Sequence, residues 1–266
     1  MDVPPEELEA DLFVIGPEAP LVEGLADRLR AAGRLVFGPG ADGARLEGSK
    51  AWMKDLLVEA GVPTARHGSF TEREAALEFL DTMAPPFVVK TDGLAAGKGV
   101  VVTESLTEAR NAVEDYLSGV AFGDAGLRLV IEEGLVGREL SVLAVCDGNT
   151  AVLLPEAQDF KRARDGDEGP NTGGMGAYSP VPAVTADLME VVRTEFVLPT
   201  LAALARGAST TAESSMRVSC SPPMVRGSWS TTCASATLRP RWCFPGSPVT
   251  WRRCWQERRP AASTPR

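Results

Sequence analysis

Two lysines lie beside a glycine-rich stretch of the chain, within Pro85–Val102 (PPFVVKTDGLAAGKGVVV). Lys90 ends a short run of β-branched residues, and Lys98 lies among the glycines that follow. Glycine lets a backbone approach a ligand closely, so its N–H groups can point at phosphate oxygens. Two ammonium groups beside such a stretch are suited to a polyphosphate. The alternative is an ordinary glycine-rich hairpin with solvated lysines.

This stretch does not fit the Walker A motif. That motif has four residues between Gly and Gly-Lys, followed by Ser or Thr and a helix. Here three residues separate Gly93 from Gly97, and a strand comes next. The flanking runs, Phe87–Val89 and Val100–Thr103, are typical of buried strands. The pattern therefore predicts two strands joined by a flap that covers phosphates.

Three carboxylates follow in Leu127–Ser141 (LRLVIEEGLVGRELS). The expected strand Leu129–Ile131 runs into Glu132 and Glu133, and after a glycine turn Glu139 heads another strand. Carboxylates accept hydrogen bonds from ribose hydroxyls, and exposed backbone can pair with the edge of a base. The stretch therefore suits a nucleoside. A charged hairpin without a ligand is the alternative.

A third candidate is the stretch Glu156–Tyr178, which is rich in glycine and charge. We expect a long irregular loop here. Loops of this length inside a compact domain are usually functional or disordered. The run Pro170–Gly176 (PNTGGMG) is suited to backbone contact with a ligand, which favours a binding loop.

The elements that would position these residues form a mixed α/β chain. The strand Asp11–Gly16, the helix Leu21–Ala32 and the strand Leu35–Gly38 predict a β-α-β unit of a parallel layer. The next expected helix is Ala44–Ala60, which carries Lys50. The Lys50 side chain either points towards the flap or is solvated, and the residues alone leave both possibilities open.

Four further elements are expected: a helix from Thr71 to about Met83, a helix over Thr107–Leu117, a strand over Ala151–Pro155 and a helix over Thr185–Ala205. Thr71, with Glu74 three residues later, predicts a capping box. Thr107 is expected to cap the second helix. His67 is expected in a polar surface turn.

Composition bounds the class of protein. A chain of 266 residues allows one or two domains. No stretch approaches the roughly 20 apolar residues of a membrane span, and the acidic start lacks a signal-peptide pattern. A net charge of −9 argues against nucleic acid as a main partner. We therefore expect a cytoplasmic protein without a membrane partner.

The composition changes after Gly207. The tail has no Lys, Asp or Ile, and its nine arginines against two glutamates give it a net charge of +7. Four of the five cysteines and four of the five tryptophans lie there. These cysteines lack zinc-like spacing, and a disulfide scaffold does not suit the expected compartment. Cys146, in the main body, is expected to be a small buried hydrophobe.

Five strings between about Asp11 and Gly207 resemble the phosphoribosylamine–glycine ligase family of the ATP-grasp ligases. They are IGPEAPLVEGLAD (Ile15–Asp27), GPGADGARLEGSKAWMKDLL (Gly38–Leu57), VVKTDGLAAGKGV (Val88–Val100), IEEGLVGRELS (Ile131–Ser141) and QDFKRARDGDEGPNTGGMGAYSP (Gln158–Pro180). The last string is specific to this family, whereas the flap and the carboxylate turn are shared across ATP-grasp enzymes.

The resemblance implies an α/β (α+β) ATP-grasp fold, with two small antiparallel sheets around a nucleotide cleft and with Lys90 and Glu133 facing each other across it. It implies a partial N-terminal α/β domain over residues 1–48, an incomplete ATP-grasp domain over 49–206 and an out-of-family, disordered tail over 207–266. The implied reaction joins glycine to 5-phosphoribosylamine at the expense of ATP, with Mg²⁺ or Mn²⁺, through a glycyl phosphate in purine biosynthesis. We expect a monomer.

The resemblance also implies the site residues. Those of the nucleotide site are Lys50, Lys90, Lys98, Glu132, Glu133, Leu135 and Glu139. The residues assigned a catalytic role are Lys90, Asp159 and Lys161. The acceptor substrates would meet the phosphates at Asn171, Thr172, Gly173 and Gly174.

The chain departs from the family pattern at both ends. The family begins with a further strand and a glycine-rich loop, which we expect to be truncated here. Its magnesium-binding Glu and Asn lie in an E-x-N-x-R-F-G-D-P-E string that the tail lacks, so no metal ligand is assigned. Read one base out of frame, the tail codons can encode VEYNVRFGDPE, which indicates a frameshift near Gly207. We therefore expect weak ATP binding and no ligation.

Two other functions remain open at this stage. The first is another ATP-grasp carboxylate–amine ligase, although the PNTGGMGAY string disfavours it. The second is a nucleic-acid-binding or regulatory protein that uses its basic tail. Nucleic-acid binding that survives at physiological salt and needs the tail would support the second.

Overall fold

The computed structural model describes residues 4–93, 99–119, 127–135, 137, 139–166 and 168–206, together with the backbone of Ser214–Cys220 and Ala234–Ser235. Within these ranges the chain is a mixed α/β structure with two four-stranded and two two-stranded sheets. The predicted α/β class is therefore confirmed.

The N-terminal part contains the expected parallel pair of strands. Its elements are η1 (Pro5–Glu7), β1 (Phe13–Val14), α1 (Glu18–Val22), α2 (Leu25–Ala31), β2 (Val36–Phe37) and α3 (Ala41–Gly48). β1 pairs in parallel with β2. The single helix predicted over Leu21–Ala32 is wrong, because Gly24 adopts a φ of 79° and separates α1 from α2. Leu21, Ala26 and Leu29 are fully buried in a small core between these elements.

The helix predicted over Ala44–Ala60 is also divided. Ser49 has extended φ and ψ of −142° and 111°, so α3 ends before it and α4 (Lys50–Glu59) begins after it. The Ser49 side chain accepts a hydrogen bond from the backbone N–H of Trp52, as an N-cap does. Lys50 is therefore the first residue of a helix, where the chain changes direction.

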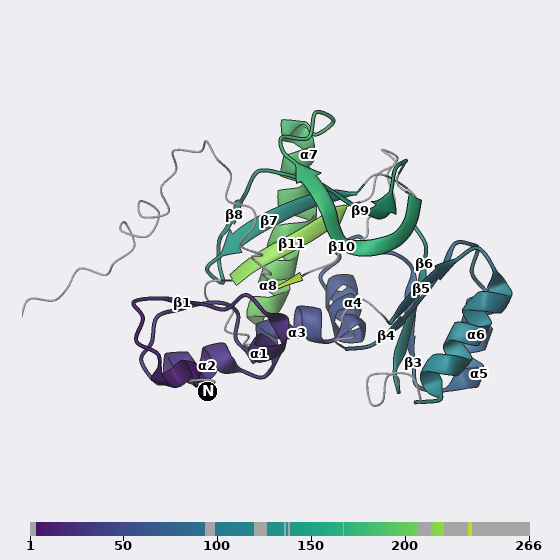
Figure 1. Ribbon diagram of the computed structural model, residues 1–266, viewed down its shortest axis with the longest axis horizontal. Helices are drawn as coiled ribbons and strands as arrows, with labels where there is room; N and C mark the ends of the chain where they lie inside the picture. Colours follow the sequence, from purple (N-terminus) through teal and green to yellow (C-terminus); the bar gives the residue numbers. More distant parts are fainter. Residues whose placement is uncertain are drawn as a thin grey trace, which may run out of the picture.

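The first four-stranded sheet has the order β3-β6-β4-β5 and is antiparallel throughout. Its strands are β3 (His67–Phe70), β4 (Phe87–Thr91), β5 (Val100–Thr103) and β6 (Leu129–Glu133). Helices α5 (Arg73–Asp81) and α6 (Leu106–Leu117) cover one face, where Val89, Leu129 and Ile131 are completely buried (Figure 1). The predicted strands on either side of the flap are confirmed.

Three local predictions around this sheet are wrong. His67 begins β3 and does not lie in a turn. Glu72 occupies the N-cap of α5, with no side-chain cap hydrogen bond, so Thr71 forms no capping box. Ser105, not Thr107, caps α6, because its side chain accepts from the N–H of Glu108. Serine is as good a cap as threonine, so the apolar pattern alone could not place these helix starts.

The second four-stranded sheet has the order β12-β11-β7-β8. Its strands are β7 (Leu140–Cys146), β8 (Ala151–Leu153), β11 (Ser214–Cys220) and β12 (Ala234–Ser235). Of the tail that was expected to be disordered, the backbone of β11 pairs antiparallel with β7 along its length. β12 pairs antiparallel with β11, and the other residues of the tail lie outside the described ranges.

The helix predicted over Thr185–Ala205 is continuous in the structure but not regular. It consists of α7 (Ala186–Val191), a π-helical segment η3 (Val192–Val197) and α8 (Leu198–Arg206). Thr185 caps it by accepting from the N–H of Leu188 at 3.2 Å. Val192 and Phe196 are fully buried against β7 and α4 in the largest core of the described chain. Cys146 belongs to the same core, as predicted.

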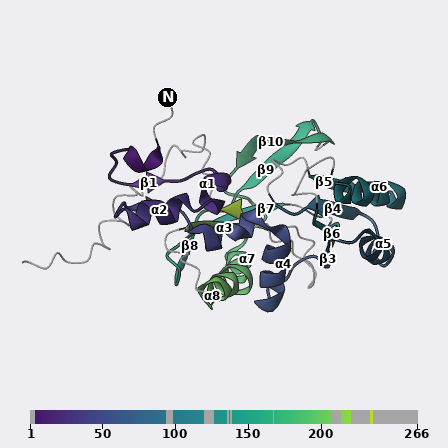
Figure 2. The same ribbon diagram turned by 90° about the horizontal axis from the view of Figure 1, so that it is seen from below.

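The stretch Glu156–Tyr178 is not the irregular loop that was predicted. It folds back on itself as a hairpin of β9 (Gln158–Arg164) and β10 (Glu168–Tyr178), with irregular register between Glu168 and Gly176. An isolated bridge between Ser141 and Ala157 joins the start of the hairpin to β7. Figures 1 and 2 show the hairpin extending from the side of β7 towards the first four-stranded sheet, and Figure 1 shows α4 between the two larger sheets. None of the described helices is long and apolar enough to cross a membrane.

Candidate active site

The start of α4 is fixed to the loop that follows β4. The Ser49 hydroxyl lies 3.1 and 3.2 Å from the two carboxylate oxygens of Asp92, and the backbone N–H of Ala51 donates to Asp92 at 3.1 Å. Lys50 Nζ donates to the carbonyl oxygen of Gly93 at 2.6 Å. Because the expected flap begins directly after Gly93, these contacts hold Lys50 at its base. Burial lowers the pKa of Lys50, an effect that Asp92 opposes.

A cluster of charged side chains lies between α4 and the first sheet. The two carboxylate oxygens of Glu132 bind two different lysines: Oε1 lies 3.0 Å from Lys90 Nζ and Oε2 lies 2.9 Å from Lys54 Nζ. Lys54 Nζ also donates to Thr64 Oγ1 at 2.8 Å. Lys90 pairs with Val130 in the β4–β6 ladder, two residues from Glu132, so both side chains project from the same face of the sheet.

Exposure differs sharply within this cluster. The side chains of Lys54 and Glu132 are 1% and 4% exposed, whereas that of Lys90 is 23% exposed. Burial alone would raise the pKa of Glu132, but Lys90 and Lys54 together hold it below its ordinary value. Burial lowers the pKa of Lys54, against the attraction of Glu132. With both lysines protonated, one carboxylate faces two cations, and Lys90 carries the more accessible charge.

The sequence analysis did not identify Lys54 as a member of the charged cluster, although its spacing from Lys50 was a signal. Lys50 and Lys54 are four residues apart, which places them on the same face of α4. A lysine in the middle of a helix is normally solvated, and only the tertiary structure shows that this one is buried.

Glu133 lies in a different place from the one expected. Its side chain accepts from the backbone N–H of Arg66 at 2.9 Å, and its own N–H donates to the Arg66 carbonyl at 3.0 Å. Glu133 and Lys90 belong to adjacent strands of one sheet, with Glu133 opposite Phe87. The prediction that they face each other across a cleft between two sheets is therefore wrong. Leu135 is half-buried after β6, and Glu139 is exposed directly before β7.

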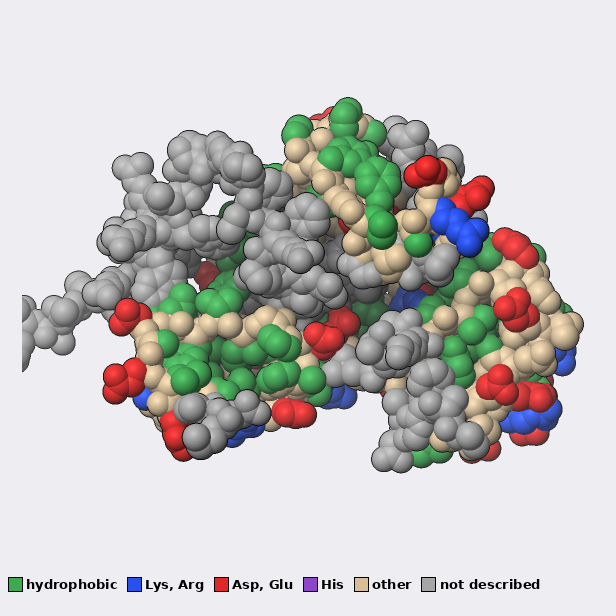
Figure 3. Space-filling model, in the orientation of Figure 1, with side chains coloured by type: hydrophobic (Ala, Val, Ile, Leu, Met, Phe, Trp, Pro, Cys, Tyr) green, Lys and Arg blue, Asp and Glu red, His purple; other side chains and the backbone are tan. Residues whose placement is uncertain are grey.

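The β9–β10 hairpin presents the other predicted residues. Asp159 accepts a hydrogen bond from Ser141 Oγ at 3.2 Å, which ties the hairpin to β7. Thr172 Oγ1 accepts from the N–H of Gly174 at 3.1 Å. Lys98 and the side chains of Lys161 and Asn171 lie outside the described residues, as does the local environment of Gly173. Figure 3 shows a small patch of basic side-chain surface between this hairpin and the first sheet.

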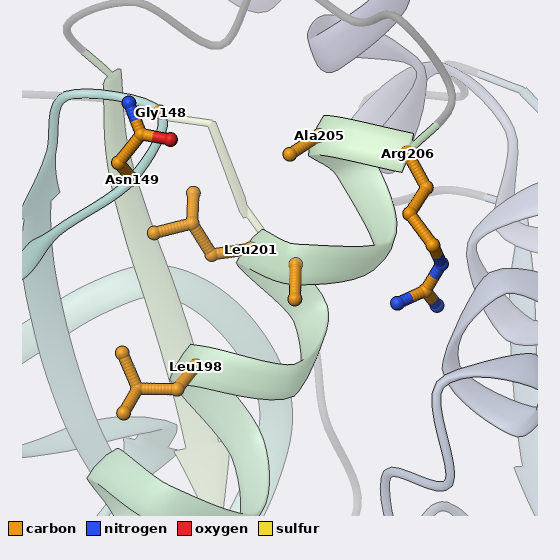
Figure 4. A pocket seen from close by; sticks show the side chains of 7 residues that line it. Gly148, Asn149, Leu198, Leu201, Ala205 and Arg206 are labelled. Atoms are coloured by element: carbon orange, nitrogen blue, oxygen red, sulfur yellow. The ribbon is translucent and has the colours of Figure 1, made fainter.

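The described chain also has an apolar cavity of about 450 Å³ that is separate from this cluster. Its lining residues are Gly148, Asn149, Leu198, Leu201, Ala202, Ala205 and Arg206. Figure 4 shows Leu198 and Leu201 pointing from α8 towards the β-strands. None of the predicted site residues lines it, so it does not belong to the lysine–carboxylate cluster.

The described residues contain no ready-made cluster of protein ligands for a metal ion. No three His, Cys, Asp or Glu side chains gather there closely enough to hold one. The carboxylates nearest the cluster are already engaged, Glu132 by two lysines and Asp92 by the start of α4. We therefore derive no step through Mg²⁺ from these residues.

Comparison with known proteins gives a consistent result along the chain. A model of the phosphoribosylglycinamide synthetase N domain matches residues 5–47, and a model of the ATP-grasp (A) domain of the same family matches residues 48–211. The phosphoribosylamine–glycine ligase of Xanthomonas axonopodis pv. citri is 55% identical over 190 residues, covering 71% of this chain and 44% of that protein. The ligase of Escherichia coli K12 is 52% identical over 200 residues, covering 75% and 47%.

Comparison with solved structures gives matches to the same family and to the same fold. The crystal structure of phosphoribosylamine–glycine ligase from Thermotoga maritima matches with a TM-score of 0.65 and 34% identity, over 76% of this chain and 50% of that one. D-alanyl-alanine synthetase A from Vibrio cholerae matches with a TM-score of 0.63 at 15% identity, over 85% of this chain and 67% of that one, which shows a shared fold alone. The chain spans about half the length of the curated relatives it matches. Since the ATP-grasp model alone covers more than half of its residues, the chain belongs to the phosphoribosylglycinamide synthetase family.

Proposed function

We propose that the chain carries the nucleotide-binding part of a ligase that joins glycine to 5-phosphoribosylamine. A glycine carboxylate oxygen attacks the γ-phosphorus of ATP, and ADP leaves. The amine nitrogen of 5-phosphoribosylamine then attacks the acyl carbon, the C–O bond to phosphate breaks, and the nitrogen loses a proton. The products are glycinamide ribonucleotide, ADP and inorganic phosphate. A cytoplasmic location and a monomeric state remain part of this proposal.

One observation supports the nucleotide site most strongly. Lys50 and Lys90, from two different elements, both reach the end of β4 where the glycine-rich stretch begins. Each carries a positive charge when protonated. Burial lowers the pKa of Lys50, and the nearby charge of Lys90 lowers that pKa as well. Two cations that repel each other in the free protein would both be stabilised by an anion between them. A polyphosphate is such an anion.

The remaining roles follow the family assignment. Lys50 and Lys90 bind phosphate oxygens, and Lys98 covers them. The adenosine would lie against Glu133, Leu135 and Glu139. The acceptor substrates and the transferred phosphate would meet at Asp159, Lys161, Asn171, Thr172, Gly173 and Gly174. Their task is to position the reactants and to neutralise charge, which is how proteins accelerate phosphoryl transfer.

Calorimetric titration of the 266-residue chain with ADP tests the nucleotide site. We expect Lys50→Met and Lys90→Met each to weaken ADP binding about tenfold, because each removes a charge-assisted hydrogen bond to phosphate. Arg110→Met is a matched control, because it removes from α6 a cation that forms an exposed pair with Asp81 of α5. Equal ADP affinity in all three variants would refute the assigned site.

Thermal unfolding tests the acceptor. A ligand that binds only the folded state raises the midpoint of unfolding. With a non-hydrolysable ATP analogue present, glycine is expected to raise the midpoint of the chain, and D-alanine is not. Stabilisation by D-alanine alone would instead favour another ATP-grasp carboxylate–amine ligase, the alternative that the shared fold with D-alanyl-alanine synthetase A keeps open.

A further inference from the structure

The proposed reaction assigns no ligand contact to Lys54, a cation buried beside the site. Its side chain is 1% exposed, and its ammonium group binds Glu132 and Thr64. Burying a lysine is costly, so its position needs an explanation. We propose that Lys54 is a positioning residue for polyphosphate binding, which acts through Glu132 on Lys90. This inference rests on the proposed function, because it assigns Lys90 to the phosphates.

The geometry of Glu132 shows how the effect is transmitted. Its carboxylate has two oxygens, and each is held by a different lysine. Lys54 is held in turn by Thr64 at 2.8 Å, so Oε2 is fixed from the side of α4. With Oε2 engaged, Oε1 is the oxygen that faces Lys90. The carboxylate is therefore oriented before any ligand arrives.

The charge count explains why a second lysine is needed. If Lys54 were neutral, Glu132 and Lys90 would form a simple ion pair, and Lys90 would be neutralised by its own partner. Lys54 shares the negative charge, so the cluster keeps one net positive charge when both lysines are protonated. That charge lies at Lys90, the member with 23% exposure. An ammonium group has three N–H donors, and Glu132 Oε1 engages one of them.

A merely structural role predicts a different result from a positioning role. If Lys54 only stabilised the fold, its removal would weaken every ligand of the site alike. If it sets the position and free charge of Lys90, its removal weakens ligands with phosphates and leaves those without phosphates unchanged. ADP and adenosine share the base and ribose, so the ratio of their dissociation constants separates the two roles.

The first experiment measures both dissociation constants for the 266-residue chain and for Lys54→Met. We expect about a tenfold loss of ADP affinity, the size of one charge-assisted hydrogen bond, and less than about a twofold change for adenosine. Thr64→Val is a milder variant that keeps Lys54 but removes its second partner, and a smaller loss confined to ADP is expected. Arg110→Met should change neither constant.

The second experiment is a double-mutant cycle with Glu132→Gln. If Lys54 acts through Glu132, Lys54→Met causes less than about a twofold further loss of ADP affinity in the Glu132→Gln background. A full tenfold loss in that background would overturn the proposal, and so would equal losses for ADP and adenosine. If the proposal failed in this way while the wild-type chain bound ADP normally, the nucleotide site itself would still stand. A wild-type chain that binds neither ligand would instead refute the nucleotide site and this inference together.

Discussion

At the scale of single residues, the ionised state of Glu132 depends on its two lysines. Its pKa lies below the ordinary value of 4.5 although the side chain is almost completely buried. Removing one partner of a buried pair leaves an uncompensated charge. The carboxylate therefore contributes to stability as well as to the site, and its contribution depends on pH.

The sign of this pH dependence follows from the lowered pKa. The stabilisation by Glu132 is fully present above about pH 4.5, the ordinary value, and is lost as the pH falls through the lower folded-state pKa. We expect the urea midpoint of the wild-type chain to fall over this acidic range, and Glu132→Gln to reduce that fall. Urea unfolding curves recorded between about pH 7 and pH 3 measure this fall of the midpoint for both proteins. Asp81→Asn, in an exposed pair, is the control, and an equal acid response of Glu132→Gln and wild type would contradict the expectation.

Gly134 provides a second test at this scale. A Cβ atom built at this glycine would lie 2.5 Å from Pro86 Cγ and 2.6 Å from the Pro86 carbonyl oxygen. The N–H of Gly134 donates to that same oxygen at 2.7 Å, so the two backbones cannot separate without losing the bond. We expect Gly134→Ala to lower the free energy of unfolding by about 2 kcal/mol. Gly176→Ala, with nothing within 4 Å, should change it by less than about 0.5 kcal/mol. Equal free energies of unfolding for Gly134→Ala and Gly176→Ala, measured in urea, would contradict the predicted clash at Gly134.

At the scale of elements, the break at Ser49 turns α4 towards β4. Ser49 both caps the helix and donates to Asp92, so the first turn of α4 is joined to the loop after β4. The apolar pattern continues through Ser49, and a helix interrupted by one extended residue keeps nearly the same periodicity. For that reason the sequence predicted one helix where the structure has α3 and α4.

Two serine caps make a matched comparison. Ser49→Ala and Ser105→Ala each remove an N-cap, and each is expected to cost about 1 kcal/mol in the free energy of unfolding. Only Ser49→Ala should also weaken ADP binding, because only Ser49 is bonded to Asp92 beside Lys50. Titration calorimetry together with urea unfolding separates the two effects. An equal loss of ADP affinity in both variants would show that the break at Ser49 does not position the site.

Some elements could be predicted from the sequence and others could not, for physical reasons. The strands β4 and β6 are continuous apolar runs buried within a sheet, and such runs were identified correctly. The β9–β10 hairpin was missed, because its strands are rich in glycine and charge and lack the alternation of a half-buried strand. Lys50 and Lys90 were chosen from the sequence, and both lie near the end of β4, while their assignment to a nucleotide stays a prediction. The burial of Lys54 depends on contacts between α4 and β6 that no local pattern records.

At the scale of the whole molecule, the described chain has three separate hydrophobic cores of unequal size. The smallest supports the two-stranded sheet β1–β2, and a sheet of two strands is marginally stable by itself. The others support the two four-stranded sheets. Stability is therefore expected to vary along the chain.

Hydrogen exchange followed by mass spectrometry measures this variation. We expect amides of β1 and β2 to exchange first, and amides of β4 and β6, in the middle of their sheet, to exchange last. A difference of at least about tenfold in rate is expected, since it corresponds to only about 1.4 kcal/mol in local opening free energy. Uniform exchange across these four strands would show instead that the described chain unfolds as one cooperative unit.

Helix α4 carries Lys50 and Lys54 on one side and contributes Met53 and Leu57 to the core shared with β7 and α8. An enlarged or shortened side chain at either apolar position would shift the helix axis and, with it, both ammonium groups. Substitutions at Met53 and Leu57 are therefore expected to act twice, once on folding and once on the proposed nucleotide site, whereas substitutions at equally buried positions in α2 are expected to affect folding alone. Substitutions that a thermal assay would score as neutral can for this reason still be eliminated by selection.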